Sequence, residues 1–288
     1  MRRRRSGRKL SSPVVAEQST LLGLPGTSNF LKKDAWSISA EGRNTISMEA
    51  YKDDLAFIHD VGFGDFAKNS APGLLEILRK NGIKTGLVVD LGCGSGLWAR
   101  ELSKAGYDVL GVDISAAMIA MARKRAPRGE FQTASLLKVK LPQCDAVTSL
   151  GECLNYLFDK SNRMSELRRL FRRVYTALKP GGLFLFDIAE PGRGKGPRQK
   201  HREGRDWAVL VEVDEDARTN RLTRRITTFR KVARLYRRDE EIHQLQLYKR
   251  AEVANELRRV GFRVRTIDGY GAQPMIEGCT GFVARKPS

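Results

Sequence analysis

The sequence predicts an α/β fold, a three-layer sandwich in which helices cover both faces of a mostly parallel sheet. Two observations carry this prediction. Between residues 87 and 188, short apolar runs alternate with longer amphipathic stretches, which is the pattern of strands joined by crossover helices. The first two apolar runs end in Asp90 and Asp113, and a glycine-rich turn follows Asp90. Such a βαβ unit places both acids at one edge of the sheet.

The first eighty residues precede this alternating region. Residues 1–47 are rich in Ser, Gly and Arg and have no apolar periodicity, so we expect a disordered, basic leader there. Met48 is a candidate for the natural start of the protein. Residues 49–82 contain amphipathic stretches broken by glycines and predict one or two helices that end at Gly82.

The alternating region supplies the elements of the predicted sheet, with right-handed connections as the default. The expected strands lie near residues 87–91, 107–112, 130–134, 144–149 and 182–188. The expected helices lie near residues 97–105, 115–126 and 161–178.

The pattern changes after residue 189. Residues 190–205 are rich in Gly, Pro, Lys and Arg and predict a mobile loop. From Trp207 to Tyr248 apolar and polar residues alternate around a turn at residues 214–220, which indicates an antiparallel meander of about three strands. A helix over 251–260 that stops at Gly261, then strands over 262–267 and 279–284, complete the expected chain. We therefore expect a core of residues 48–189 and 249–288, with residues 190–248 as a β-meander insert.

The glycine-rich turn indicates which kind of ligand the sheet edge binds. Residues 88–96 read Val-Val-Asp-Leu-Gly-Cys-Gly-Ser-Gly, and glycines without a Cβ let a ligand approach the backbone closely. A carboxylate such as Asp113, at the end of the second strand, can accept hydrogen bonds from two ribose hydroxyls. Together they predict an adenosine-type ligand. Leu97 stands where the dinucleotide pattern G-x-G-x-x-G has its third glycine, which argues against a nicotinamide enzyme.

This pattern, with Asp90 ahead of the three glycines, resembles motif I of the class I S-adenosylmethionine-dependent methyltransferases. The resemblance continues in register through residues 131–135, 144–149 and 178–186, and covers residues 85–190 strongly and 249–285 loosely. It implies a Rossmann-like, mostly parallel seven-stranded sheet with an antiparallel last strand. It also implies S-adenosylmethionine as cofactor and methyl transfer as the reaction.

The resemblance further implies roles for individual residues. Asp90 is expected to help hold the methionine amino group, and Asp113 to bind both ribose hydroxyls. Other residues are expected to contact the methionine, ribose or adenine or to line the methyl channel: Gly92, Cys93, Gly94, Gly96, Ile114, Met118, Ser135, Leu136, Leu150 and Gly151.

No catalytic triad is evident, and methyl transfer needs none, because aligning donor and acceptor supplies much of the rate. The family places substrate contacts after the fourth strand, where this chain has Glu152, Asn155 and Tyr156. Glu152, Tyr156 and His59 are the candidates for acceptor-side chemistry. A helix N-terminal acid, favoured by the helix dipole, would explain Glu152 equally well. The chain lacks the Asn/Asp-Pro-Pro-Tyr/Phe motif of base methyltransferases, which counts against adenine or cytosine N-methylation.

The sequence indicates only the class of molecule that accepts the methyl group. The insert leaves the sheet after Asp187, at the edge where ligands bind in such folds, so it can roof an acceptor pocket. This arrangement resembles that of small-molecule methyltransferases acting on amino groups of sugars or metabolites. We therefore expect a small-molecule N or O acceptor. A non-catalytic protein that kept the cofactor fold is a further alternative.

The charge of the chain suggests another alternative. The net charge is +19, of which residues 157–288 carry +13, and a basic surface attracts nucleic acid. A methyltransferase acting on RNA or protein is therefore the alternative function. The arginine pairs are spread over different predicted elements, without the interleaved aromatic residues of a stacking platform, so solvated basic faces are favoured.

The remaining composition points to a cytoplasmic protein. The four cysteines form no C-x-x-C motif and suggest reduced thiols. Only three histidines are present, and they suggest no metal site. No apolar run is long enough to span a membrane.

Overall fold

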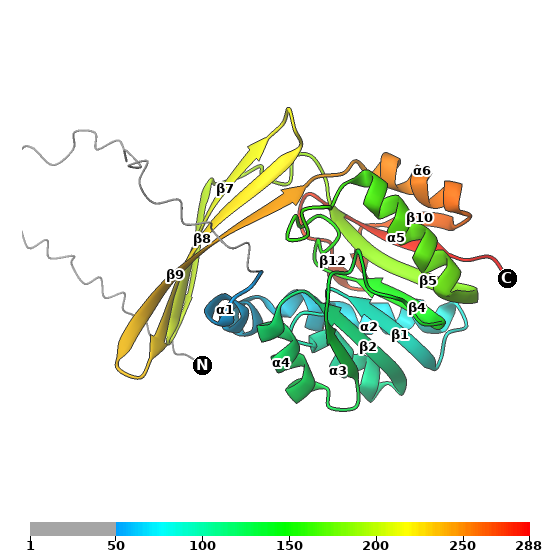
Figure 1. Ribbon diagram of the computed structural model, residues 1–288, viewed down its shortest axis with the longest axis horizontal. Coiled ribbons are helices and arrows are strands. Elements are labelled where there is room, and N and C mark those ends of the chain that lie inside the picture. Colours follow the sequence, from blue (N-terminus) through cyan, green and yellow to red (C-terminus); the bar gives the residue numbers. More distant parts are fainter. Residues whose placement is uncertain (1–49) are drawn as a thin grey trace, which may run out of the picture. The chain divides into compact units, whose positions relative to one another are not determined.

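The computed structural model describes residues 50–288, so the leader expected over residues 1–47 and the proposed start at Met48 lie outside the described residues. Seven strands form one sheet in the order β10-β13-β5-β4-β1-β2-β3 (Figure 1). The strands are β1 (Gly86–Leu91), β2 (Tyr107–Asp113), β3 (Glu130–Thr133), β4 (Cys144–Ser149), β5 (Leu178–Ala189), β10 (Arg263–Ile267) and β13 (Cys279–Arg285).

The pairing of these strands confirms the predicted Rossmann-like sheet. The pairs β1–β2, β1–β4, β2–β3 and β4–β5 are all parallel. The last strand, β13, is antiparallel to both of its neighbours, β5 and β10. The strand order steps outward from β1 in both directions, so the chain reverses its winding beside β1, and the carboxyl ends of β1 and β4 open a crevice there.

Helices cover both faces of this sheet. They are α2 (Asp65–Lys80), α3 (Leu97–Lys104), α4 (Ala116–Arg125), α5 (Met164–Ala177) and α6 (Arg250–Val260). A further helix, α1 (Asp53–Phe63), precedes them in the chain. Side chains of α2, α3 and α4 share one apolar cluster with the sheet, and side chains of α5 and α6 share another. The sandwich thus has three layers, as predicted.

Local signals in the sequence set the ends of several helices. Ser115 caps α4 by accepting a hydrogen bond from the Met118 backbone nitrogen at 3.2 Å, which is a favoured role for serine. Helix α6 ends at Gly261, whose φ of 114° lies in the left-handed region that glycine readily adopts. The helices predicted over 49–82 are α1 and α2, and α2 ends two residues before Gly82.

A second, antiparallel sheet has four strands, one more than the meander we expected. They are β6 (Gln199–Gly204), β7 (Trp207–Asp216), β8 (Arg221–Val232) and β9 (Leu235–Gln246), paired in chain order. Strand β6 lies inside residues 190–205, where we predicted a mobile loop. All six of its residues are exposed, so it carries no apolar alternation, and only its pairing with β7 makes it a strand. A short hairpin, β11 (Gly269–Tyr270) and β12 (Gln273–Pro274), completes the elements.

The second sheet packs on helix α1. Leu55 and Ile58 of α1 share an apolar cluster with Val209 and Ile226 of the sheet. The buried Asp54 pairs with Arg230 at 3.1 Å and with Arg237 at 2.5 Å. Hydrogen bonds from Arg237 lower the pKa of Asp54, although its burial opposes this. Among the described residues, no helix combines the length and apolar character needed to cross a bilayer.

Candidate active site

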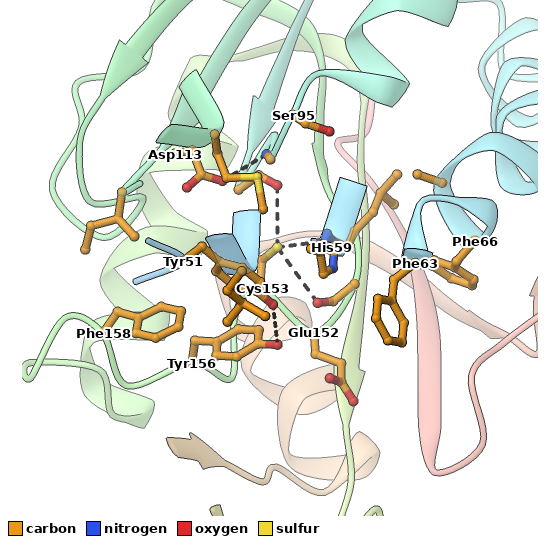
Figure 2. A pocket seen from close by; sticks show the side chains of 18 of the residues that line it. Tyr51, His59, Phe63, Phe66, Ser95, Asp113, Glu152, Cys153, Tyr156 and Phe158 are labelled. Atoms are coloured by element: carbon orange, nitrogen blue, oxygen red, sulfur yellow. Dashed lines mark hydrogen bonds between the residues drawn. The ribbon is translucent and has the colours of Figure 1, made fainter. Parts of the chain in front are cut away.

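A cavity of about 720 Å³ lies between the carboxyl ends of the parallel strands and the second sheet. Its lining includes residues that follow β1, β2, β3 and β4, residues of α1, and inward-facing side chains of β7 and β8. Both its size and its place at the strand ends are typical of ligand sites. In Figure 2, Tyr51 and Cys153 lie between Asp113 and Glu152, with His59 and Phe63 to one side.

Most residues singled out from the sequence meet in this cavity. Those that line it are Asp90, Gly92, Cys93, Gly94, Asp113, Ile114, Met118, Ser135, Leu136, Leu150, Gly151, Glu152, Tyr156 and His59. Gly96 does not line it. A Cβ on Gly96 would stand 2.9 Å from the Cα of Ala122, so this glycine is needed where α3 and α4 pack together.

Asp113 is braced by the backbone around it. Its Oδ2 accepts a hydrogen bond from the Gly94 nitrogen at 2.9 Å, and its Oδ1 accepts one from the Ser115 nitrogen at 2.8 Å. Burial raises the pKa of Asp113, while these backbone N–H groups oppose the rise. Each carboxylate oxygen can accept more than one hydrogen bond, so the residue retains acceptor capacity for a ligand in the cavity.

Asp90 lies deeper, at 2% exposure. Thr148 Oγ1 donates to Asp90 Oδ1 at 2.7 Å, and Trp98 Nε1 donates in turn to Thr148 Oγ1 at 3.2 Å. Burial raises the pKa of Asp90 to about 7, the bond from Thr148 opposes this, and the charge of Asp113 adds to it. Asp90 therefore keeps its proton to a higher pH than a carboxyl group in water does.

Ser135 shows a contact that the sequence did not indicate. Its Oγ donates to Asp159 Oδ2 at 2.6 Å, and Asp159, Phe158 and Asn162 also line the cavity. These three residues belong to an irregular segment between β4 and α5. No motif or periodicity marks them, because their place depends on how this segment folds back over the sheet edge.

Glu152 is buried and paired with two arginines. Arg224 Nη2 lies 2.8 Å from its Oε2, and Arg193 Nε contacts its Oε1. Burial alone would raise the pKa of Glu152, but the two guanidinium groups bring it to about 2. A carboxylate held this way stays ionised and is a poor proton acceptor at neutral pH.

The backbone at Glu152 also differs from expectation. The residue lies in a turn rather than at a helix N-terminus, with a φ of 64°. Asp187 holds this turn, because its carboxylate accepts hydrogen bonds from the nitrogens of Gly151 and Glu152, at 2.9 Å and 2.6 Å. Partners distant in sequence thus replace the helix dipole that we considered for Glu152.

Tyr156 and Tyr51 form a linked pair beside Glu152. Their hydroxyl oxygens lie 3.2 Å apart, and Arg224 Nη1 donates to the Tyr156 hydroxyl at 3.0 Å. Tyr51 also joins the cofactor side to the second sheet. Its carbonyl accepts a bond from Ser115 Oγ at 2.8 Å, and its backbone nitrogen donates to Glu241 Oε2 at 3.0 Å.

His59 lines the cavity from α1 and packs edge-on to Tyr51, with ring centroids 5.1 Å apart. Burial lowers the pKa of His59 to about 4, against the opposing charge of Asp60. Its imidazole is therefore neutral at pH 7. No hydrogen bond to its ring is formed by any residue from 50 to 288, so both ring nitrogens are available to a ligand.

Asn155, which follows the fourth strand, and His243 lie outside the cavity. Asn155 holds backbone together, donating to the carbonyls of Ala189 at 2.9 Å and Gln246 at 2.7 Å. His243 is 1% exposed, and its Nε2 lies 2.8 Å from Glu241 Oε2. Both residues support the walls of the site and do not line it.

The central segment of the chain is similar in sequence to known methyltransferases. Residues 88–182 match the family model described as a methyltransferase domain. A protein of Geobacillus sp. (strain WCH70), whose name assigns it provisionally to the methyltransferases, is 38% identical over 106 residues, which are 35% of this chain and 41% of that protein. A ubiquinone biosynthesis O-methyltransferase of Alkalilimnicola ehrlichii is 32% identical over 112 residues, covering 36% and 42%. The chain thus spans less than half the length of these curated relatives.

Solved structures match a much larger share of the chain. A sugar N-methyltransferase of Streptoalloteichus sp. ATCC 53650 is similar over 87% of this chain and 99% of its own, with a TM-score of 0.71 and 20% identity. A S-adenosylmethionine-dependent methyltransferase of Clostridium acetobutylicum ATCC 824 is similar over 81% and 98%, with a TM-score of 0.68 and 20% identity. At this identity the likeness establishes the fold alone.

Proposed function

We propose that this chain is a class I S-adenosylmethionine-dependent methyltransferase and that it methylates a nitrogen or oxygen of a small molecule. One observation carries the proposal. A single cavity joins the glycine-rich turn and Asp113 to a chamber under the second sheet. A cofactor and an acceptor can therefore meet in one continuous space, which is the condition for an in-line transfer.

The cofactor half of the cavity fits S-adenosylmethionine. Gly94 has a φ of 52°, and nothing lies within 4 Å of the place where a Cβ would be, so a ligand can lie against this backbone. Asp113 offers its remaining acceptor capacity to ribose hydroxyls, and Asp90 offers a carboxylate to the amino group. Bound S-adenosylmethionine would supply a methyl group activated on a sulfonium.

The acceptor half favours a small molecule. Its roof includes apolar side chains of β7 and β8, among them Val209, Val211 and Ile226. Walls of this kind exclude water and fit a compact ligand better than a polymer. A sugar N-methyltransferase shares this fold over 87% of the chain, so the fold is known to serve a small-molecule acceptor.

Among the three acceptor-side candidates, His59 is neutral at pH 7, and its ring has no hydrogen-bond partner within residues 50–288. We assign it the task of accepting a hydrogen bond from the N–H or O–H of the acceptor, which turns the lone pair of the nucleophile toward the cofactor side. Tyr156 is engaged with Tyr51 and Arg224, and Glu152 with two arginines. We infer that these two residues shape the chamber and do not take the proton.

The alternative of an RNA or protein substrate has less support. Many surface arginines pair with neighbouring carboxylates, which lowers the net field that they present to a polyanion. Examples are Arg168 with Glu256, Arg169 with Glu166, Arg225 with Glu212, and Arg238 with Glu240.

Calorimetry on the full chain tests the proposal, with S-adenosylmethionine, S-adenosylhomocysteine and NAD as parallel ligands. We expect the first two to bind and NAD to fail. A second assay follows transfer of a labelled methyl group into metabolite, RNA and protein fractions of an extract. Label confined to the metabolite fraction supports the proposal. Absence of binding to both sulfur nucleosides, or label in RNA alone, would contradict it.

A further inference from the structure

Four cationic side chains line the cavity: Arg193, Lys200, Arg202 and Arg224. Five carboxylates line it as well, those of Asp65, Asp90, Asp113, Glu152 and Asp159, so any excess of positive charge is local to the surroundings of Glu152. Inside the chamber, Arg193 and Arg224 share the single carboxylate of Glu152. Their side chains are only 16% and 15% exposed. A buried cation without a full counter-charge is costly, because burial removes it from water.

The two arginines differ in how fully they are engaged. Arg224 donates through Nη1 to Tyr156 and through Nη2 to Glu152. Arg193 contacts Glu152 through Nε alone, and its two terminal nitrogens have no partner among residues 50–288. A guanidinium presents these nitrogens as a planar fork, which matches two oxygens of a carboxylate or phosphate. Glu152 fixes the other edge of the same group.

We propose that Arg193 binds an acidic group of the methyl acceptor, a carboxylate or a phosphate, and that the substrate is therefore a small anion. This inference rests on the proposed function and adds the class of substrate to it. Glu152 positions the guanidinium, and the exposed Lys200 and Arg202 at the cavity lining favour entry of an anion. Arg193 thus acts as a specificity-determining residue for the acceptor.

Two other roles for Arg193 are tested by the same experiment. In one, it binds the carboxylate of the cofactor; in the other, it only holds Glu152 in place. These possibilities give distinct outcomes in one experiment. The full-length protein is saturated with S-adenosylhomocysteine and titrated with acetate, inorganic phosphate or pyrophosphate, with acetamide as the neutral comparison. Sodium chloride keeps the ionic strength equal in all titrations, so general screening is removed. Thermal shift and calorimetry report binding.

We expect at least one anion to stabilise the protein and acetamide to have no effect. Arg193→Gln should weaken that binding at least about tenfold, the loss of one charge-assisted contact, and Arg193→Lys should retain part of it. Arg225→Gln, which removes the same charge from a side chain that is 62% exposed and does not line the cavity, should change nothing. Preference for acetate or for the phosphates tells which acidic group the site takes.

Three results would overturn the inference. The first is that no anion binds the wild-type protein, and the second is that Arg193→Gln binds the anions unchanged. The third is that Arg193→Gln weakens binding of S-adenosylhomocysteine rather than of the anions, which would assign Arg193 to the cofactor. Failure of the wild-type protein to bind S-adenosylhomocysteine would instead refute the proposed function. In that case the anion titrations on the ligand-free protein still decide whether Arg193 is an anion site.

Discussion

Asp113 Oδ2 accepts a hydrogen bond from the Gly94 nitrogen at 2.9 Å, so the acid after β2 and the glycine-rich turn after β1 form one rigid unit. This contact explains why the two sequence features belong together. The carboxylate holds the turn in place, and the turn holds the carboxylate at the cavity. Groups that are already ordered in this way lose little conformational entropy when a ligand binds.

Asp113→Ala should weaken binding of S-adenosylmethionine and S-adenosylhomocysteine more than about tenfold, since charge-assisted hydrogen bonds to the ribose are lost. Calorimetry measures the effect. Asp108→Ala is the matched control, because Asp108 lies on the same strand with its side chain exposed. Equal affinities in the two variants would remove Asp113 from the cofactor site.

Gly94→Ala and Gly82→Ala form a second matched pair. Both glycines have positive φ, 52° and 86°, and a Cβ at either position meets nothing within 4 Å. Each substitution should therefore cost about 1–2 kcal/mol of unfolding free energy for the left-handed backbone. Only Gly94→Ala places a methyl group at the cavity, so only it should impair cofactor binding. Similar cofactor affinities in both variants would contradict the proposed cradle.

Asp90 should make stability depend on pH. Its pKa is raised from 3.8 to about 7, so the folded state keeps a proton that the unfolded state releases. This contribution is fully present below about pH 4 and is lost as the pH rises to about 7, by up to about 1.4 kcal/mol per pH unit. Asp187, with a pKa raised to about 6 mainly by burial, acts in the same direction.

Denaturant unfolding at pH 5, 6 and 7 tests this dependence by comparing the wild-type protein with Asp90→Asn. The wild-type protein should lose more stability than the variant over this range, because the variant cannot titrate at residue 90. Parallel pH profiles for the two proteins would show that Asp90 does not titrate as described.

His59→Phe should slow methyl transfer at least about tenfold while leaving cofactor affinity unchanged. The substitution keeps an aromatic ring against Tyr51 but removes the hydrogen-bond acceptor, whose loss is worth about one hydrogen bond. Since the pKa of His59 is about 4, the wild-type rate should show no inflection from this residue between pH 6 and 8. Single-turnover rates measure the change. An undiminished rate would leave His59 a packing residue.

Arg224→Gln should destabilise the fold by about 3 kcal/mol, the low end of the cost of breaking a buried ion pair, because Arg193 still faces Glu152. The neighbouring Arg225→Gln should stay within about 0.5 kcal/mol, because the Arg225 side chain is exposed. Urea unfolding of the two variants makes the comparison. A similar cost at both positions would mean that the ion pair with Glu152 contributes little to stability.

The sequence determined the sheet and the cofactor edge of this protein, because both depend on local signals. A few neighbouring residues are enough to recognise each of these signals: the apolar runs of strand length, the turn from Asp90 to Gly96, and the acid at Asp113. Even there, Gly96 shows the limit of the pattern, since only its contact with Ala122 reveals that it serves packing.

Only the tertiary structure decided the acceptor half of the site. From the sequence, Glu152 was a candidate for acceptor-side chemistry or a helix N-terminal acid, yet its partners Arg193 and Arg224 lie 41 and 72 residues away along the chain. Strand β6 has no alternation of apolar and polar residues, and it forms because its backbone pairs with the edge strand β7. Burial lowers the pKa of His59, and this makes it a neutral hydrogen-bond acceptor at pH 7. Charge pairing, edge pairing and burial all arise between distant segments, so no local pattern encodes them.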